Sequence, residues 1–381
     1  MPIGFEIYVV QPGDTIDAIA IKYGVDVNQI IIDNQLIFPY ALAIGQALFI
    51  DLGIRIPVRD LRVSGYAYPF ISSWVLEQTL PYLSELPIFS YGFTGDGELI
   101  PPNLSEDRMI TLSYEFGTAP ILTLTPFDEM GNFSNFLINQ LVNNPTAVNN
   151  LIQNLLNVMT EKGYQGVDID FEYILAEDRD EFTNFVAQIS ESMRNNGYHT
   201  SIAMAPKTSA EQKGLLYEGK DYRALGEIVD HALIMTYEWG YTYGPPMAVA
   251  PINQVRRVIE YAVTEIEPSK IDLGIPNYGY DWPLPYIRGT TAATTIGNVQ
   301  AVQIAIAQGV PIEFDELTQS PYFKYNKDGI EHEVWFEDVR SIQRKFDLIN
   351  EYELGGCGYW QIMRWWRANW KLLQKYFYIE K

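Results

Sequence analysis

The sequence predicts an α/β protein in which a (β/α)8 TIM barrel is preceded by a small β-α-α-β domain. Eight apolar, strand-like runs alternate with helical patterns along residues 58–381, which is the order of a parallel barrel. The chain divides near residue 55, and 381 residues are enough for about two domains. Hydrophobic residues at 47% against charged residues at 19% exclude a disordered chain.

The first unit, residues 5–51, carries the signals of two strands and two helices. Its opening run, FEIYVVQ, is rich in β-branched and aromatic residues, and a turn containing Gly13 follows it. Either Asp14 or Thr15 can cap the next helix. The predicted elements are a strand at 5–11, a helix that ends at Gly24, a second helix at 27–34 and a closing strand at 47–50.

In the second unit, residues 58–381, eight runs have the composition of buried strands. A doubly wound open sheet is the alternative, but no Gly-rich phosphate loop follows the first run. The clearest helix precedes the fourth run, from Asn144-Pro145 to Gly163. The predicted strands lie at 62–70, 87–93, 120–126, 166–174, 200–206, 231–239, 271–280 and 355–362.

Composition excludes several classes of function. The formal net charge of −22 repels phosphate backbones, so we expect no nucleic-acid partner. One cysteine, Cys357, excludes an internal disulfide framework, and His199, His231 and His332 are scattered without metal-ligand spacing. There is no apolar run of about 18 residues and no basic head before an apolar stretch, so we expect neither a membrane span nor a cleavable signal peptide.

The fourth predicted strand carries the strongest functional signal. Asp168, Asp170 and Glu172 stand at alternate positions, so the pleat points the three carboxyl groups to one face. Active sites of such barrels lie at the C-terminal ends of the strands. Because carboxylates inside a barrel repel one another, at least one should have a raised pKa, as a general acid needs. The alternating residues, Ile169, Phe171 and Tyr173, are expected to face the helices.

Aromatic residues make up 14% of the chain. We expect most of them in the core, and some along a groove, because flat rings suit the faces of sugars. Tyr66 in the first predicted strand and Tyr278 in the seventh are candidates for substrate contacts.

Residues 5–51 resemble a LysM module over their whole length. The resemblance is carried by YVVQPGDTIDAIAIKYGV, by Asn34 and by the closing IGQALFI. LysM modules bind glycans that contain N-acetylglucosamine, such as peptidoglycan and chitin. The resemblance implies a glycan groove in which Gly13, Asp14 and Thr15 face residues near 37–41.

Residues 165–172, QGVDIDFE, resemble the fourth-strand signature of glycoside hydrolase family 18, Asp-Gly-x-Asp-x-Asp-x-Glu. Met235 to Tyr237 on the sixth predicted strand match that family's Met-x-Tyr, and Trp360 matches its tryptophan floor. We also expect Met235 and Glu238 beside the substrate.

The resemblance implies a role for each residue of the catalytic site. Glu172 would be the general acid/base, and Asp170 would orient the acetamido N–H of the substrate, with assistance from Asp168. Tyr237 would donate its hydroxyl to the acetamido oxygen, and Trp360 would lie beneath the sugar. The family's mechanism is retaining and substrate-assisted, so the resemblance implies no carboxylate nucleophile, no metal and no cofactor.

Two positions depart from the family's pattern. Gln165 stands where the motif has its first Asp, and Glu238 follows Tyr237 where Asp is commoner. We expect Gln165 to alter the properties of the acids more than the reaction that they carry out. We expect the longer Glu238 to reshape the neighbouring subsite.

Segments 235–252, 275–282 and 332–338 resemble spore-associated bacterial members of the family that act on cortex peptidoglycan. The resemblance implies cleavage of β-1,4 bonds at N-acetylglucosamine by a protein of the spore coat or cortex. Two alternatives stay open: a chitinase or endo-β-N-acetylglucosaminidase, and a lectin-like wall or coat protein without catalysis. Endo or exo action and the oligomeric state do not follow from the sequence.

Between the seventh and eighth strands, in residues 283–353, we expect helices at 296–308 and 335–352. They leave little room for a sizeable extra domain, so we expect a shallow groove.

Overall fold

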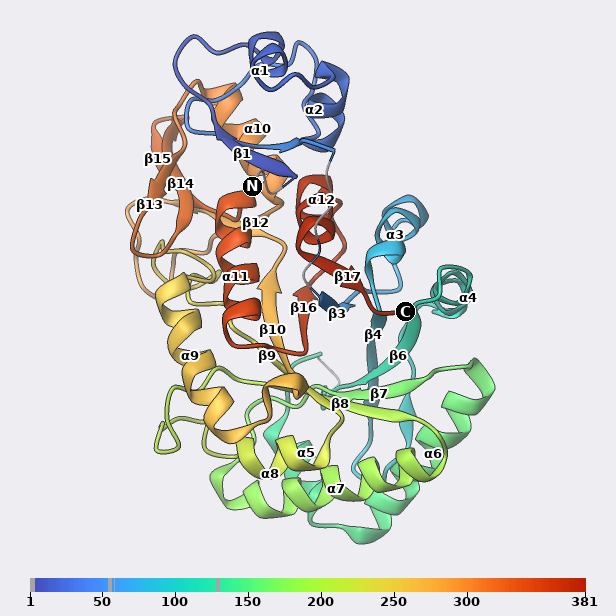
Figure 1. The fold of residues 1–381 in the computed structure, drawn as a ribbon. Coiled ribbons are helices and arrows are strands. Elements are labelled where there is room, and N and C mark those ends of the chain that lie inside the picture. Colours follow the sequence, from blue (N-terminus) through green and yellow to red (C-terminus); the bar gives the residue numbers. More distant parts are fainter. Residues whose placement is uncertain (1–3, 54–56, 58, 128–130) are drawn as a thin grey trace.

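The computed structural model describes residues 4–53, 57, 59–127 and 131–381. It contains a small N-terminal module and a barrel of eight parallel strands surrounded by helices (Figure 1). The predicted fold class is therefore confirmed. The predicted start of the barrel unit, residue 58, lies outside the described residues.

The N-terminal module has the predicted β-α-α-β order. Thr15 accepts a hydrogen bond from the Ala18 backbone N–H and so caps the first helix, which Gly24 ends in the left-handed conformation. Asp14 does not cap this helix, because its carboxylate accepts from the Tyr8 hydroxyl instead. The elements are β1 (Phe5–Val9), α1 (Ile16–Tyr23), α2 (Val27–Asp33) and β2 (Ala47–Asp51), and the two strands pair antiparallel.

The barrel closes because its first strand also pairs with its second along the chain. All neighbouring strands of the ring are parallel, and apolar side chains of both strands and helices form its main core. In chain order the eight strands are β3 (Arg59–Gly65), β4 (Glu85–Phe93), β6 (Ala119–Leu124), β7 (Gly166–Ile169), β8 (His199–Met204), β9 (His231–Ile234), β10 (Ile271–Pro276) and β16 (Gly356–Trp360). Outside the ring, β5 (Leu99–Ile100) and β17 (Phe377–Ile379) extend β4 and β3.

The outer helices follow the apolar periodicity of the sequence. Asn144 caps the helix that we expected before the fourth strand, and Gly163 ends it. No helix in the described ranges is both long and apolar enough to cross a membrane. The helices are α3 (Ser73–Thr79), α4 (Asp107–Glu115), α5 (Asn135–Val142), α6 (Pro145–Lys162), α7 (Arg179–Asn195), α8 (Tyr222–Ile228), α9 (Ile252–Glu265), α11 (Val339–Glu351) and α12 (Arg367–Tyr376), with single 3-10 turns at Leu80–Tyr82, Ala176–Asp178 and Pro268–Lys270.

Several strands end earlier than the apolar pattern predicts. The fourth ends at Ile169, before two of the three acids, because the chain leaves the hydrogen-bonded ladder at the C-terminal rim. Phe171 still packs against the helices, with its ring 5.6 Å from that of Phe185 on α7. The prediction for Tyr173 is wrong: the backbone turns there to φ 58°, and the side chain is exposed.

The expectation of little room for an extra domain is wrong as well. An insertion between β10 and α11 forms a five-stranded antiparallel sheet with its own apolar core. An Asp328-Gly329 turn between two alternating runs is a hairpin signal that would have revealed β14 and β15. The insertion consists of β11 (Gly279–Pro283), β12 (Thr294–Ile296), α10 (Asn298–Gln308), β13 (Glu313–Asp315), β14 (Ser320–Lys327) and β15 (Ile330–Trp335).

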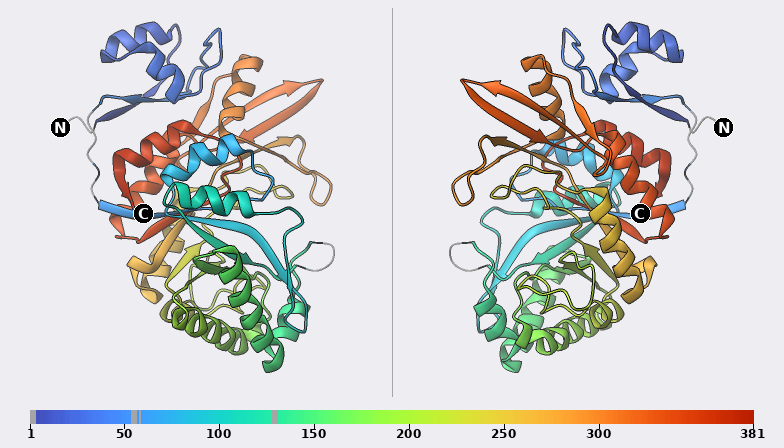
Figure 2. Two further views of the ribbon diagram at one scale, coloured as in Figure 1. Left: turned by 90° about the vertical axis from the view of Figure 1, so that its right-hand side faces the viewer. Right: turned by 90° about the vertical axis from the view of Figure 1, so that its left-hand side faces the viewer.

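The N-terminal module packs against α12, α11 and the insertion (Figure 2). Ion pairs join it to both ends of α12. The guanidinium of Arg367 lies 2.8 Å from a buried Asp33 carboxylate oxygen, and Lys375 lies 2.6 Å from Asp51. Because each pair is partly shielded from water, these contacts hold the module more firmly than exposed ion pairs would.

Apolar contacts continue the same interface. The ring of Phe5 lies between those of Phe49 and Tyr376, with centroids 5.9 and 6.0 Å away, and this cluster belongs to the barrel's core. On the insertion side, a Cβ on Gly45 would lie 1.9 Å from the Ile312 carbonyl oxygen, so a side chain does not fit there. The module and the barrel therefore form one packed body.

A buried ionic network lies at the N-terminal end of the barrel. His231 places Nδ1 2.7 Å from Asp272 and Nε2 3.3 Å from Glu85, and His199 lies 3.3 Å from the same Glu85 oxygen. Arg62 completes the network through Asp272. Burial by itself would lower the pKa of His231, but Glu85 and Asp272 raise it to about 10.

We expect Phe49→Ala to lower the free energy of unfolding by about 3–5 kcal/mol, because it removes a buried ring from the shared core. All eight tryptophans lie beyond residue 73, so tryptophan fluorescence during denaturation reports on the barrel and its insertion and not on the N-terminal module. Phe136→Ala, at an exposed position of α5, is the matched control and should stay within about 0.5 kcal/mol. An unshifted fluorescence midpoint in Phe49→Ala would show that the module and barrel unfold independently.

We expect His231→Gln to lower the free energy of unfolding by about 3–5 kcal/mol, because it removes the cation between Glu85 and Asp272 and leaves Glu85 buried. A histidine whose folded pKa is about 10 and whose unfolded pKa is about 6.5 stabilises fully below pH 6.5 and progressively less towards pH 10. Denaturation of both proteins between pH 6.5 and 8 tests this, since the difference between wild type and variant should shrink as pH rises. A stability difference that stays constant with pH would contradict a protonated His231 in the folded protein.

Candidate active site

The three acids of the fourth strand lie together at the C-terminal end of the barrel. Asp168 is buried, and it accepts hydrogen bonds from the Tyr66 hydroxyl at 2.8 Å and the Ser201 hydroxyl at 2.7 Å. Asp170 is 5% exposed, and its Oδ1 has no hydrogen-bond partner among the described residues. Glu172 is partly exposed at the rim. The ladder thus runs from a fully bonded acid inside the barrel to an accessible one.

Burial and mutual repulsion favour the protonated forms of these acids. Burial raises the pKa of Asp170 well above its usual range, and the charges of Glu172 and Asp168 raise it further. Burial also raises the pKa of Glu172, against the opposing charge of Lys220. For Asp168 the burial effect is larger than the opposing hydrogen bonds from its two hydroxyl partners, so its pKa is raised too. The sequence prediction that crowding would raise at least one pKa agrees with this picture.

Tyr237 lies beside the acids, just beyond the end of β9. Burial and the charges of Asp170 and Glu172 raise the pKa of its hydroxyl well above the usual range, so it remains a hydrogen-bond donor. Its ring passes close to Gly274 on β10, where an added Cβ would lie 2.8 Å from the ring. A small residue at that position is what admits the ring.

An aromatic cluster adjoins the acids. Trp360, at the end of β16, packs its ring 5.0 Å from that of Phe89 and 5.7 Å from that of Tyr66. The ring of Tyr68 lies 6.1 Å from that of Trp360. Because Tyr66 also binds Asp168, the indole and the carboxylates belong to one site.

Glu238 forms a third part of the site. Its carboxylate accepts from the hydroxyls of Tyr278 and Tyr280, and the charge of Glu172 acts on it. Tyr278, which we expected to contact substrate, donates its hydroxyl to Glu238 in this structure. Met235 packs half-buried against the core, and its N–H donates to the Met204 carbonyl.

Sequence reasoning missed five residues of the site, among them Ser201 on β8, whose hydroxyl donates to Asp168. Tyr280 lies two residues after Tyr278 in IPNYGYDW, and both hydroxyls donate to Glu238, so the spacing of the two tyrosines is the sequence signal for it. Tyr68 and Phe89 are ordinary core aromatics in sequence. Lys220 lies in a loop without a recognisable motif, and tertiary packing alone brings it to the acids.

The predicted residues of the N-terminal module lie on its exposed turn. Gly13 adopts φ 86° with open space around its Cα. Asp14 and Thr15 are engaged in the turn and the helix cap described above. Across the module, the loop between α2 and β2 exposes Phe38 and Tyr40, whose rings meet edge to face at 5.7 Å.

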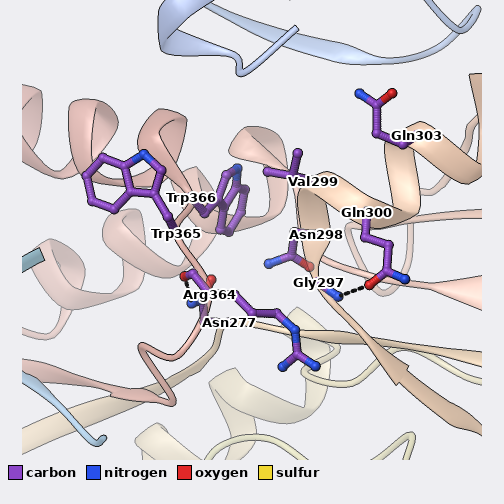
Figure 3. A pocket seen from close by; sticks show the side chains of 9 residues that line it. All are labelled: Asn277, Gly297, Asn298, Val299, Gln300, Gln303, Arg364, Trp365 and Trp366. Atoms are coloured by element: carbon purple, nitrogen blue, oxygen red, sulfur yellow. Dashed lines mark hydrogen bonds between the residues drawn. The ribbon is translucent and has the colours of Figure 1, made fainter. Parts of the chain in front are cut away.

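A separate cavity of about 420 Å³ lies between the start of α10 and the segment after β16 (Figure 3). Trp366, Val299 and Gln303 are among the residues around it, and the N-terminal module passes above it. None of the carboxylates lines this cavity, and Arg364 is the charged residue in its wall. Unlike the cluster of acids, this cavity offers no group that exchanges a proton near neutral pH.

One group of side chains has the composition of a metal site. Ligand atoms of Glu85, His199 and His231 lie within 4.8 Å of one another, so two of the three histidines that are scattered in sequence meet in the fold. This group is the ionic network at the opposite end of the barrel from Glu172. A protonated His231 has no lone pair left for a metal, and we interpret the group as structural.

Comparisons with known proteins identify the family of both units. The model of glycosyl hydrolases family 18 matches residues 130–364, and that of the LysM domain matches residues 8–51. The cortical fragment-lytic enzyme of Bacillus subtilis is 38% identical, over 99% of each chain. The putative sporulation-specific glycosylase YdhD of the same organism is 36% identical, over 98% of this chain and 88% of its own.

Solved structures give the same result. The crystal structure of the Bacillus cereus spore cortex-lytic enzyme SleL superposes with a TM-score of 0.94 at 32% identity, over 99% of both chains. A chitinase from Chromobacterium violaceum, at 23% identity and a TM-score of 0.76, shares the fold over 83% of this chain and 98% of its own. The chain therefore belongs to glycoside hydrolase family 18, as a glycoside hydrolase whose barrel is preceded by a LysM domain.

Proposed function

We propose that this protein hydrolyses spore cortex peptidoglycan, cleaving β-1,4 bonds at N-acetylglucosamine with retention of configuration. The observation that carries the proposal is the ladder of Asp168, Asp170 and Glu172 with the Tyr237 hydroxyl beside it. Full-length similarity to cortical fragment-lytic enzymes supports cortex as the substrate and the spore as the place of action.

In the first step, the carbonyl oxygen of the substrate's acetamido group attacks the anomeric carbon. Glu172, whose pKa is raised by burial, gives its proton to the glycosidic oxygen as the bond to the leaving sugar breaks. Tyr237 donates its hydroxyl to the acetamido oxygen. The unpartnered Oδ1 of Asp170 is free to accept the acetamido N–H and stabilises the positive ring that forms.

In the second step, Glu172 takes a proton from water, and the hydroxide oxygen attacks the anomeric carbon of the oxazolinium ring. The ring opens, the acetamido group is restored, and the product keeps its original configuration. Asp168 assists Asp170 throughout. It does not compete with Asp170 for the substrate, because its own oxygens already accept hydrogen bonds from Tyr66 and Ser201. Trp360 would lie beneath the sugar at the cleaved bond.

A chitinase shares all of this chemistry, and it remains the second candidate. Similarity to chitinases supports it less, because the matches lie at 24% identity or below and the solved structures among them show the fold alone. A lectin-like protein without catalysis is a weaker candidate, since Glu172 is retained with an accessible side chain.

We expect Glu172→Gln to lower kcat on cortex-type peptidoglycan fragments by at least about 100-fold, because the amide cannot deliver a proton. Mass spectrometry of the products would show new reducing ends at N-acetylglucosamine with wild type and none with the variant. Glu177→Gln, on the exposed turn that follows, is the matched control. Cleavage that survives Glu172→Gln would refute the assignment of the acid, and glycan binding without cleavage by wild type would favour the lectin.

The LysM domain is proposed to hold insoluble glycan through the turn at Gly13 and the facing loop. Deleting residues 1–54 would be a poor test, because the domain covers α12 and completes the barrel's core. We instead expect Phe38→Ala with Tyr40→Ala to weaken binding to sacculi about tenfold, while cleavage of soluble fragments is kept. Ile21→Ala, an exposed apolar residue on α1, is the control for a pelleting assay. Unchanged pelleting would move the glycan site elsewhere.

A further inference from the structure

Lys220 is a buried lysine at the catalytic end of the barrel for which the mechanism above has no role. It lies in the loop between β8 and α8 and is 1% exposed. Its Nζ donates to the Ala203 carbonyl at 2.6 Å, at the end of β8. The loop is tightly placed, because a Cβ on the preceding Gly219 would lie 2.4 Å from the Ile174 carbonyl oxygen, just beyond Glu172.

The strand register brings this ammonium group to the acids. On β7 and β8, Asp168 pairs with Ser201. Ala203 therefore lies level with Asp170 on the neighbouring strand, and adjacent strands are about 4.8 Å apart. Held at the Ala203 carbonyl, the Nζ of Lys220 lies beside the strand end from which Asp170 projects.

Lys220 balances the acids without pairing with any one of them. Within the described ranges, no carboxylate lies at ion-pair distance from its Nζ, yet its positive charge acts on Asp168, Asp170 and Glu172. Burial lowers the pKa of Lys220 to about 8, against the opposing effect of the acids, so it is largely protonated at neutral pH. Among the other described groups, the charge of His231 acts on Asp168 from the opposite end of the barrel. The remaining titratable groups that act on this site are acidic: Glu85, Tyr66, Tyr68, Tyr173, Tyr237 and Glu238.

We propose that Lys220 is a positioning residue for the reaction, whose ammonium group is the fixed counter-charge of the three acids and decides at which pH Glu172 carries its catalytic proton. The inference rests on the proposed function. A positive charge beside Asp170 favours its ionised form before the substrate's own positive charge develops. The same charge weakens the hold of Glu172 on its proton, so that Glu172 can release the proton to the glycosidic oxygen.

The test is the pH dependence of kcat/KM for Lys220→Met and Lys220→Gln on cortex-type fragments. Without the positive charge both acids bind protons more tightly, so both limbs of the profile should move to higher pH, by roughly one unit. Activity below neutral pH should fall, because Asp170 becomes protonated there. Lys220→Gln keeps a donor for the Ala203 carbonyl and so separates the loss of charge from the loss of the hydrogen bond. Lys220→Arg, which restores the charge, should return the profile towards wild type.

Lys207 provides the matched control. It is also buried, and its Nζ donates to the carbonyl of Lys220 itself at 3.1 Å. Its charge acts on other groups than the three acids. Lys207→Met therefore disturbs the same loop without removing the counter-charge, and its pH profile should match wild type. An unshifted profile in both Lys220→Met and Lys220→Gln, or an equal shift in Lys207→Met, would overturn the proposal.

Infrared titration gives a readout that does not need activity. The band of protonated carboxylic acids should persist to higher pH in Lys220→Gln than in wild type, and Glu172→Gln should remove part of it. If wild type fails to cleave any fragment, the proposed function fails, and the infrared shift still decides the role of Lys220. An infrared titration identical in wild type and Lys220→Gln would refute the counter-charge.

Discussion

The candidate active site is shaped by the free-energy cost of placing three carboxyl groups close together at the end of a barrel. Desolvation and mutual repulsion both favour protonation, and each acid has different neighbouring groups. Asp168 is satisfied by two hydroxyls and stays at the inner end of the ladder. Asp170 keeps an unpartnered oxygen, and Glu172 reaches the rim. One short strand and the segment that follows it thereby produce an anchoring acid, an acid with a free acceptor and an accessible proton donor.

The opposite end of the barrel uses the same physics for stability. There His231 lies between Glu85 and Asp272, so buried negative charge is neutralised by a buried cation within ion-pair distance. At the catalytic end Lys220 balances charge from a distance and leaves the acids free for a substrate. The two ends are also linked, because the charge of His231 acts on Asp168 through the barrel interior.

The LysM domain is a structural part of the enzyme as well as a candidate glycan-binding module. Phe5 and Phe49 complete the core around α12, and ion pairs clamp both ends of that helix. A domain fixed in this way presents its exposed turns at a constant position relative to the barrel. A glycan chain held by Phe38 and Tyr40 would then reach the acids in a limited range of orientations, unlike a chain held by a flexibly linked module.

The sequence by itself determined the order of the elements, the LysM and barrel units and the alternation that places Asp168, Asp170 and Glu172 on one face, because these depend on residue type and local periodicity. Strand ends at the rim, the turn at Tyr173 and the insertion's sheet were predicted poorly, since ladder partners and long-range pairing decide them. Tertiary structure alone brought Lys220 to the acids and joined His199 and His231 to Glu85, although these residues lie far apart in sequence. Burial and close approach of charges set protonation, and both exist only after the chain has folded.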